Sequence, residues 1–277
     1  MTVFIKKLVL CLMIPVIFFS CSDDDGDDPE PPGKKYLSSI VTSFEDLSAS
    51  LNFSYNSNNY ITDIQFDGGL QSRFFYDDQN RLTKVEYQKL PTEPVRSFVY
   101  SYQGREVEEV HIKDPGNLDS NDTIIYTLND LNLITGSRKR KAGQNENIVH
   151  YTYNTDNRLM RKDIEYVNDP SRKGQCTYSY DDKTHPLYFL PNGNIYLCVN
   201  KLLDEALPVT GISSFINNCL SQKEINVYTD NVIIPFEEYV STYIYDDDGL
   251  PVSLQCGITL EDKSPFITEW TFKYEVR

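Results

Sequence analysis

The sequence predicts an all-β fold. The expected architecture is an antiparallel meander of about seven Tyr-rich hairpin repeats, forming a curled sheet or open barrel with a short helical insertion. Two observations lead to this expectation. An aromatic-x-Tyr pattern followed by Asp or Asn recurs along the chain, and one long gap with helical periodicity interrupts the recurrence.

Each repeat has one anchor position, which is Tyr in six units and Leu in one. Successive anchors are 21, 26, 26, 25, 27 and 65 residues apart. Five near-equal intervals indicate a structural repeat, and the sixth indicates an insertion. The anchors are Tyr55, Tyr76, Tyr102, Leu128, Tyr153, Tyr180 and Tyr245.

One unit shows why the pattern predicts a hairpin. Tyr151 and Tyr153 place two rings on the same face of a strand, because side chains alternate between faces. Asn154 and Asn157 favour a turn, since Asn tolerates left-handed backbone geometry and bonds its own backbone. Leu159 then resumes the alternation. No hairpin of this kind buries its aromatic face alone, so neighbouring units must pair.

These units resemble YD repeats, the Tyr-Asp hairpins of Rhs-type shell proteins. The closest matches are Tyr76-Asp77 with Asn80-Arg81-Leu82, and Tyr153-Asn154 with Asn157-Arg158-Leu159. The family usually has Gly where Asn80 and Asn157 stand. The resemblance implies a hairpin fold but no activity. Residues 36–277 are expected to form one domain of 242 residues, which is too short to enclose a protein as Rhs shells do.

The predicted insertion spans residues 190–240. Residues 200–207 (NKLLDEAL) and 211–220 (GISSFINNCL) carry apolar side chains at helical spacing. We expect these segments to form short helices that cover an end or an open face of the sheet. The alternative is a lid over a binding site.

The first twenty residues have the pattern of a lipoprotein signal peptide. Lys6 and Lys7 precede an apolar run at 8–19, which is long enough for a secretory signal and too short to span a bilayer. Cys21 follows directly after the small Ser20, where its thiol would receive a diacylglycerol group. The alternative is an ordinary secretory signal in which Cys21 has no role.

Residues 18–21 and the acidic run at 22–25 resemble those of Bacteroidetes-type lipoproteins. In that group an acidic run after the lipidated Cys directs export to the cell surface. The resemblance therefore implies an outer-membrane protein, anchored by lipid and facing the cell exterior; the alternative is the periplasmic face. Residues 21–35 would form an acidic, Pro-rich linker, since they contain too few apolar residues to fold.

Without residues 1–20 the chain has 24 basic and 41 acidic residues, a net charge of −17. This charge disfavours binding to nucleic acid, which requires clustered Lys and Arg. Four cysteines remain besides Cys21, an even count that is compatible with two disulfides in an exported protein. The expected pairs are Cys198–Cys219 and Cys176–Cys256, and free buried thiols are the alternative.

No catalytic motif is present, and the three His residues lack partners at metal-ligand spacing. The runs of two or three Asp residues after Tyr76, Tyr180 and Tyr245 fall in predicted turns, where Asp serves the backbone. We therefore predict a monomeric, non-catalytic binding or structural module without a metal or cofactor. Its aromatic content, 13% of the chain, suits contact with a glycan or protein ligand. The alternative is an extracellular hydrolase acting on glycan or peptide polymers.

Overall fold

The structure is a computed structural model. It describes residues 33–44, 47–67, 69–114, 121–141, 144–183, 219–229, 232–260 and 266–277. Residues 35–277 form one compact unit, separate from the N-terminal segment. No helix among the described residues is long and apolar enough to cross a bilayer.

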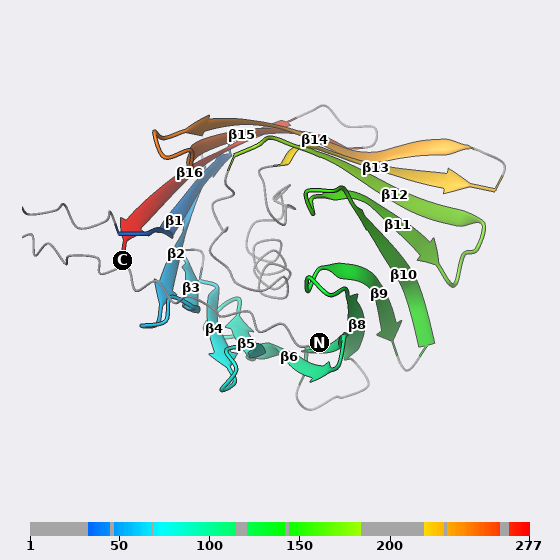
Figure 1. Cartoon of the computed structure of the whole chain (residues 1–277), viewed down its shortest axis with the longest axis horizontal. Coiled ribbons are helices and arrows are strands. Elements are labelled where there is room, and N and C mark those ends of the chain that lie inside the picture. The colour runs from blue at the N-terminus through cyan, green and yellow to red at the C-terminus, as the bar shows by residue number, and fades with distance from the viewer. Residues whose placement is uncertain are drawn as a thin grey trace, which may run out of the picture. The chain divides into compact units, whose positions relative to one another are not determined.

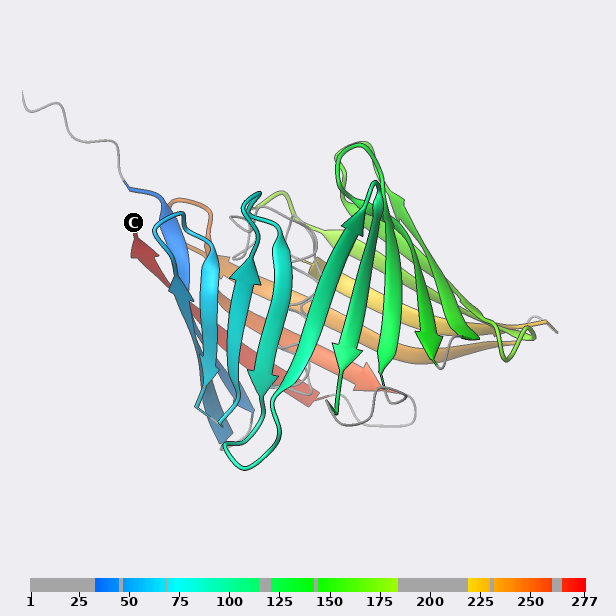
Figure 2. The same ribbon diagram turned by 90° about the horizontal axis from the view of Figure 1, so that it is seen from below.

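Sixteen antiparallel strands form a closed barrel, in which each strand pairs with its neighbours in sequence (Figures 1 and 2). The strands are β1 (Lys35–Phe44), β2 (Leu47–Tyr55), β3 (Ile61–Phe66), β4 (Gln71–Tyr76), β5 (Leu82–Gln88), β6 (Arg96–Gln103), β7 (Glu106–Ile112), β8 (Asp122–Leu128), β9 (Ile134–Lys141), β10 (Gln144–Tyr153), β11 (Leu159–Tyr166), β12 (Arg172–Tyr180), β13 (Cys219–Tyr228), β14 (Ile233–Tyr245), β15 (Pro251–Leu260) and β16 (Phe266–Val276).

The barrel closes where the first strand meets the last. β1 (blue) lies beside β16 (red) in Figure 1, and their register runs from Lys35 opposite Val276 to Ser43 opposite Glu269. Closure leaves no unpaired sheet edge, and an open edge would be a template for aggregation. An open barrel would therefore expose, along its two edge strands, backbone N–H and C=O groups that are paired in the closed barrel.

The core lies on the inner face of the barrel. Along β4, Ser72 and Phe74 are buried, whereas Gln71 and Arg73 are exposed, as expected for a strand with one face packed and one in water. The same alternation runs around the barrel. Side chains that the inner face buries to 1% exposure or less include Leu37, Ile40, Leu51, Ile61, Ile64, Leu82, Val85, Tyr87 and Leu159.

Five hairpin turns share one backbone design. The first turn residue is Asn or Asp, and its Oδ1 accepts hydrogen bonds from the backbone N–H groups two and four residues later; in one case Asp77 Oδ1 accepts from Gln79 and Arg81, both at 2.9 Å. The residue three positions after it has positive φ, which Asn and Gly adopt at the lowest cost. These residues are Asn59, Asn80, Asn132, Asn157 and Gly249, with φ of 62°, 58°, 59°, 61° and 75°.

The anchor tyrosines link neighbouring strands through their hydroxyl groups. Tyr76 Oη donates to the carbonyl of Ile61, the first residue of β3, at 2.8 Å. The paired ladder between β3 and β4 begins only at Asp63, so this carbonyl has no strand partner on that side. Equivalent bonds run from Tyr55 to Leu37, Tyr102 to Leu82, Tyr153 to Ile134 and Tyr274 to Pro251, at 2.5, 2.7, 2.8 and 2.8 Å.

Part of the predicted fold is wrong. The sheet is a closed barrel of sixteen strands, and neither a curled sheet nor an open barrel forms. The described residues contain no helix. The predicted insertion ended at residue 240, but residues 219–228 form β13 and residues 233–240 belong to β14. Residues 190–218, including the segment NKLLDEAL and most of GISSFINNCL, lie outside the described residues.

Candidate functional site

The anchor residues predicted from the sequence lie on the inner face, and their contacts serve the structure of the barrel. Six of the seven, all except Tyr102, are the last residue of their strand, at the point where the pattern placed the turn. Tyr180 and Tyr245 do not make the hydroxyl-to-carbonyl hydrogen bond that the other anchor tyrosines make. Tyr245 donates to Asp181, and the Tyr180 hydroxyl has no hydrogen-bond partner among the described residues. Burial raises the pKa of Tyr180, so its hydroxyl stays neutral.

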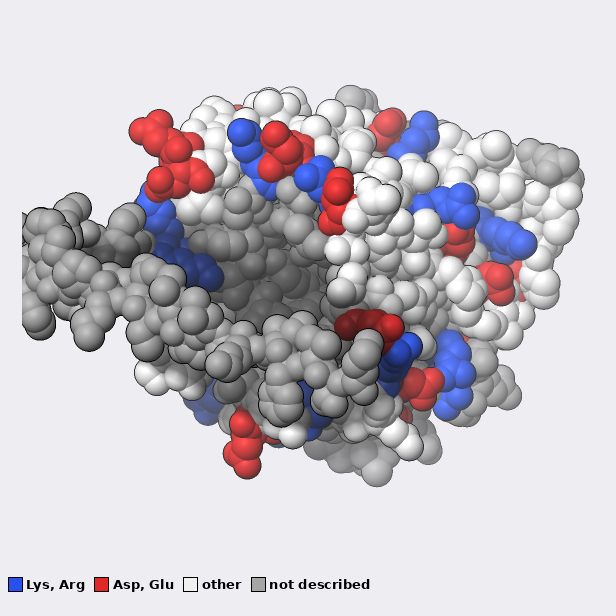
Figure 3. All heavy atoms as spheres, in the orientation of Figure 1, with Lys and Arg blue, Asp and Glu red and all other residues white. Residues whose placement is uncertain are grey.

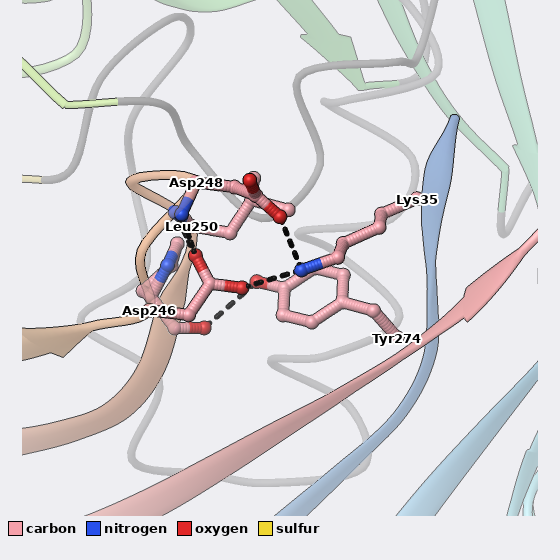
Figure 4. Close-up of polar contacts among 6 residues, drawn as sticks. Lys35, Asp246, Asp248, Leu250 and Tyr274 are labelled. Atoms are coloured by element: carbon pink, nitrogen blue, oxygen red, sulfur yellow. Dashed lines mark hydrogen bonds and ion pairs between the residues drawn. The ribbon is translucent and has the colours of Figure 1, made fainter. Parts of the chain in front are cut away.

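The Asp clusters after the anchors serve the backbone and the closure of the barrel. Asp246 Oδ1 accepts the N–H groups of Asp248 and Leu250 at 3.0 and 2.9 Å, which forms the turn after β14. Lys35 Nζ contacts Asp246 at 2.9 Å and Asp248 at 2.5 Å, so the turn holds the start of β1 (Figure 4). These two carboxylates raise the pKa of Lys35. A catalytic role is not needed to explain these aspartates.

Three cysteines lie on the inner face of β12, β13 and β15. Cys176, Cys219 and Cys256 are buried free thiols, and burial raises the pKa of Cys176 to about 11 and that of Cys219 to about 12. Cys198 and Cys21, the predicted lipid-attachment residue, lie outside the described residues. Neither expected disulfide is formed by the described cysteines, and both pairs stay predictions, as does the lipid attachment.

The aromatic side chains also face inward. Phe75, at 37% exposure, is the one aromatic residue among the exposed large hydrophobic side chains of the described residues. Trp270 is 2% exposed and packs in the core, with its Nε1 donating to Thr268 at 3.1 Å. An aromatic outer surface for ligand contact is therefore absent from the described part of the barrel.

A row of ionisable side chains crosses the inner face from β11 to β14. The register places Lys162 opposite Cys176, Cys176 opposite Glu224, and Glu224 opposite Glu237. Lys162 Nζ lies 5.2 Å from the ring centroid of Tyr178, a cation–π distance. The least favourable contact in this row is between the carboxylates of Glu224 and Glu237, because like charges directly opposite each other on adjacent strands destabilise a sheet.

The repulsion within this pair is seen in the pKa of Glu224. Burial raises its pKa above the ordinary value of 4.5, and the charge of Glu237 raises it further, whereas Lys162 and Arg172 oppose the shift. The charged form is therefore less stable in the folded protein than in the unfolded chain. Folding stability from this residue is fully present below pH 4.5 and is lost as the pH rises through the raised pKa.

Glu224→Gln should stabilise the protein at pH 7 by about 0.5 kcal/mol, because the buried carboxylate charge and its repulsion from Glu237 both disappear. At pH 4 the variant and the wild type should unfold at the same urea concentration. Urea unfolding at the two pH values measures this difference. Glu238→Gln, on the outer face of the same strand, is the control. A stabilisation that is equal at both pH values would contradict the assignment.

The outer face of the barrel is charged. At the end of the barrel that Figure 1 views, Figure 3 shows acidic and basic side chains interspersed. By the register and burial pattern, outward-pointing charged residues occur from β4 through to β16; they include Arg73, Lys84, Glu86, Glu106, Glu108, Arg138, Arg140, Arg161, Glu165, Lys173, Lys223, Glu238, Glu269 and Lys273. A lipid-facing barrel requires an apolar outer band about 25 Å tall. On these strands, charged side chains stand among exposed apolar ones such as Val240, Ile244 and Ile267, and so interrupt such a band.

A polar groove of about 170 Å³ lies on the outer face of β3, β4 and β5. Two cross-strand rows form its floor. Asp63 lies opposite Arg73, which lies opposite Glu86, and the next row places Gln65 opposite Gln71, which lies opposite Gln88. Val95, just before β6, also lines the groove.

One glutamine of the groove, Gln88, is held by hydrogen bonds, whereas the side chains of Gln65 and Gln71 are available to a ligand. Gln88 Nε2 donates to the carbonyls of Pro91 and Glu93 at 3.2 and 2.6 Å, which leaves its Oε1 as an acceptor. Gln65 and Gln71 are exposed, and their side chains have no hydrogen-bond partner among the described residues. Arg73 Nε is 3.8 Å from Asp63 Oδ1.

The sequence interpretation missed the groove and the anchor role of Tyr274. Tyr274 follows Phe272 in the same aromatic-x-Tyr pattern and could have been found as an eighth anchor. The Gln row had no sequence signal, because its members become neighbours only through strand register.

No family model matches the chain, and no curated protein matches it. Among solved structures, a porin-like protein from Bacteroides uniformis is 12% identical, with 88% of this chain and 98% of that chain covered and a TM-score of 0.41. A porin-like protein from Bacteroides vulgatus is 10% identical, with 87% and 99% covered and a TM-score of 0.43. The chain also covers 10% of a chain in the TcdB2-TccC3-Cdc42 structure, at 13% identity and a TM-score of 0.33, with 80% of this chain covered. Similarity at this level supports no inference about function.

Proposed function

We propose that the protein is an outer-membrane lipoprotein whose barrel stands in water and serves as a non-catalytic binding module. Lipid on Cys21 would be its contact with the membrane. The linker at residues 21–35 would hold the barrel off the bilayer, on the outer side of the cell.

The charged outer face is the observation that carries this proposal. A charged side chain on the lipid face of a barrel costs about 2–4 kcal/mol at the bilayer midplane. Here such residues stand on many strands from β4 through to β16, as with Arg138 on β9 and Lys223 on β13. A charged outer face, together with the lipid predicted on Cys21, fits a barrel that is tethered to the membrane and not inserted in it.

Cys21→Ala should transfer the protein from the membrane fraction to the soluble fraction. The variant cannot receive the lipid, and a barrel with a charged outer face should not insert into the bilayer by itself. Fractionation followed by immunoblotting measures the distribution, and Cys256→Ala, which keeps the lipid, is the control. Digestion of the wild-type barrel by protease added to intact cells would support surface exposure. Retention in the membrane of Cys21→Ala protein from which the signal peptide has been removed, as checked by N-terminal sequencing, would mean that the barrel itself is inserted.

The hydrolase stays a second candidate because Glu224 and Glu237 face each other on the inner face, with the pKa of Glu224 raised. A pair of carboxyl groups, one of which has a raised pKa, is typical of glycosidases. Release of reducing ends from polysaccharides by the wild type, abolished in Glu237→Gln, would support this candidate.

A further inference from the structure

We infer that the groove on the outer face of β3, β4 and β5 is a binding site for a neutral glycan. Its recognition elements are the amides of Gln65, Gln71 and Gln88. The inference rests on the binding role proposed above and names both the site and the class of ligand.

The three amides form a regular polar row. Strand pairing sets neighbouring members about 4.8 Å apart. Each free glutamine amide offers two donor hydrogens and an acceptor oxygen, and a sugar hydroxyl can likewise both donate and accept. Gln65 and Gln71 have both functions open, whereas the Gln88 amide nitrogen is already bound to Pro91 and Glu93. Such a row can exchange several hydrogen bonds with adjacent hydroxyls of one ligand.

The charges of the second row favour an uncharged ligand. Arg73 stands between Asp63 and Glu86 in the register, and Lys84 Nζ contacts Glu86 Oε1 at 2.6 Å, so each carboxylate already has a cation beside it. An anionic ligand would meet both carboxylates, and a cationic ligand would meet the guanidinium group of Arg73. Asp63 and Glu86 can still accept hydrogen bonds from hydroxyl groups, because a carboxylate has more acceptor positions than one ion pair occupies.

The closed barrel argues against a peptide as the ligand. An extended peptide binds a sheet most often by adding a strand at a free edge, with its side chains in apolar pockets. Each of the sixteen strands has two strand neighbours, so the barrel offers no free edge. Among the lining residues only Val95 and Tyr87 have large apolar side chains, and Tyr87 is buried. The lining therefore suits hydroxyl groups better than apolar side chains.

The test uses the full-length lipidated protein, purified in detergent, with four probes: maltohexaose, xylohexaose, mannohexaose and cellohexaose. We expect at least one of them to bind in isothermal titration calorimetry. In Gln65→Ala/Gln71→Ala the Kd of that probe should rise roughly tenfold, because two hydrogen bonds are lost. Gln175→Ala/Gln255→Ala, which removes two glutamines from the outer face of β12 and β15, should bind like the wild type.

Three results would overturn the inference: no binding of any of the four probes, equal binding by the Gln65→Ala/Gln71→Ala variant, or tighter binding of heparin or of a random peptide mixture than of the neutral probes. Because the protein is purified, these results do not depend on where it resides in the cell. A failure here leaves the Cys21→Ala fractionation unaffected, so the two proposals fail separately.

Discussion

Trp270→Ala should destabilise the barrel by about 3–5 kcal/mol, because the indole ring is buried and its removal leaves a cavity. Trp270 lies opposite Leu254 on β15 and opposite Thr42 on β1, so its ring packs beside the junction that closes the barrel. For a domain of this size the melting temperature should fall by roughly 10 °C.

Far-UV circular dichroism is the appropriate measurement, because Trp270 is the only tryptophan and the variant has no tryptophan fluorescence. Glu269→Ala is the matched control. Glu269 is the preceding residue on the same strand and points to the outer face, so its loss should change stability by less than about 0.5 kcal/mol. Equal effects of the two substitutions would show that the inner and outer faces are wrongly assigned.

Replacing four turn residues together by alanine should cost about 4 kcal/mol. Each of these residues has positive φ, and a left-handed backbone costs a residue such as Ala about 1 kcal/mol or more. The turns are far apart, so the costs should add. The four residues are Asn59, Asn80, Asn132 and Asn157.

The same four positions replaced by glycine provide the control, because glycine adopts positive φ without a steric penalty. That variant should stay within about 1 kcal/mol of the wild type in urea unfolding. The chain itself already uses Gly249 at the equivalent position, where a Cβ would meet no atom within 4 Å. The penalty of alanine at such a turn therefore comes from backbone conformation. Equal losses in the alanine and glycine variants would show that the Asn side chains are needed for another reason.

The hairpins were predictable because their signals are local. An Asn or Asp after the anchor, and Asn or Gly three residues later, encode one turn within five residues; Asp77 and Asn80 are an example. Alternation then assigns each side chain to a face, as it does for Phe74 and Phe75. The turn interpretation of the Asp clusters is correct for the same reason, since Asp77 and Asp246 bind backbone N–H groups two and four residues away.

The closure of the barrel and the groove were not predictable, because both depend on contacts between distant parts of the chain. β1 has no repeat motif, and its pairing with β16 joins residues at opposite ends of the domain. Whether a meander of hairpins closes depends on strand number, tilt and stagger, which no single hairpin specifies. The Gln row likewise depends on the register of three strands.

The sequence by itself determined the hairpins, their turns and the inward orientation of the tyrosine anchors, since each follows from short-range backbone preferences and the two-residue period of a strand. Only the tertiary structure decided that these hairpins join end to end and which outward side chains become neighbours. The physical reason is that register and closure are properties of the whole sheet, set by the sum of its twists and bulges and by the burial of one continuous inner face.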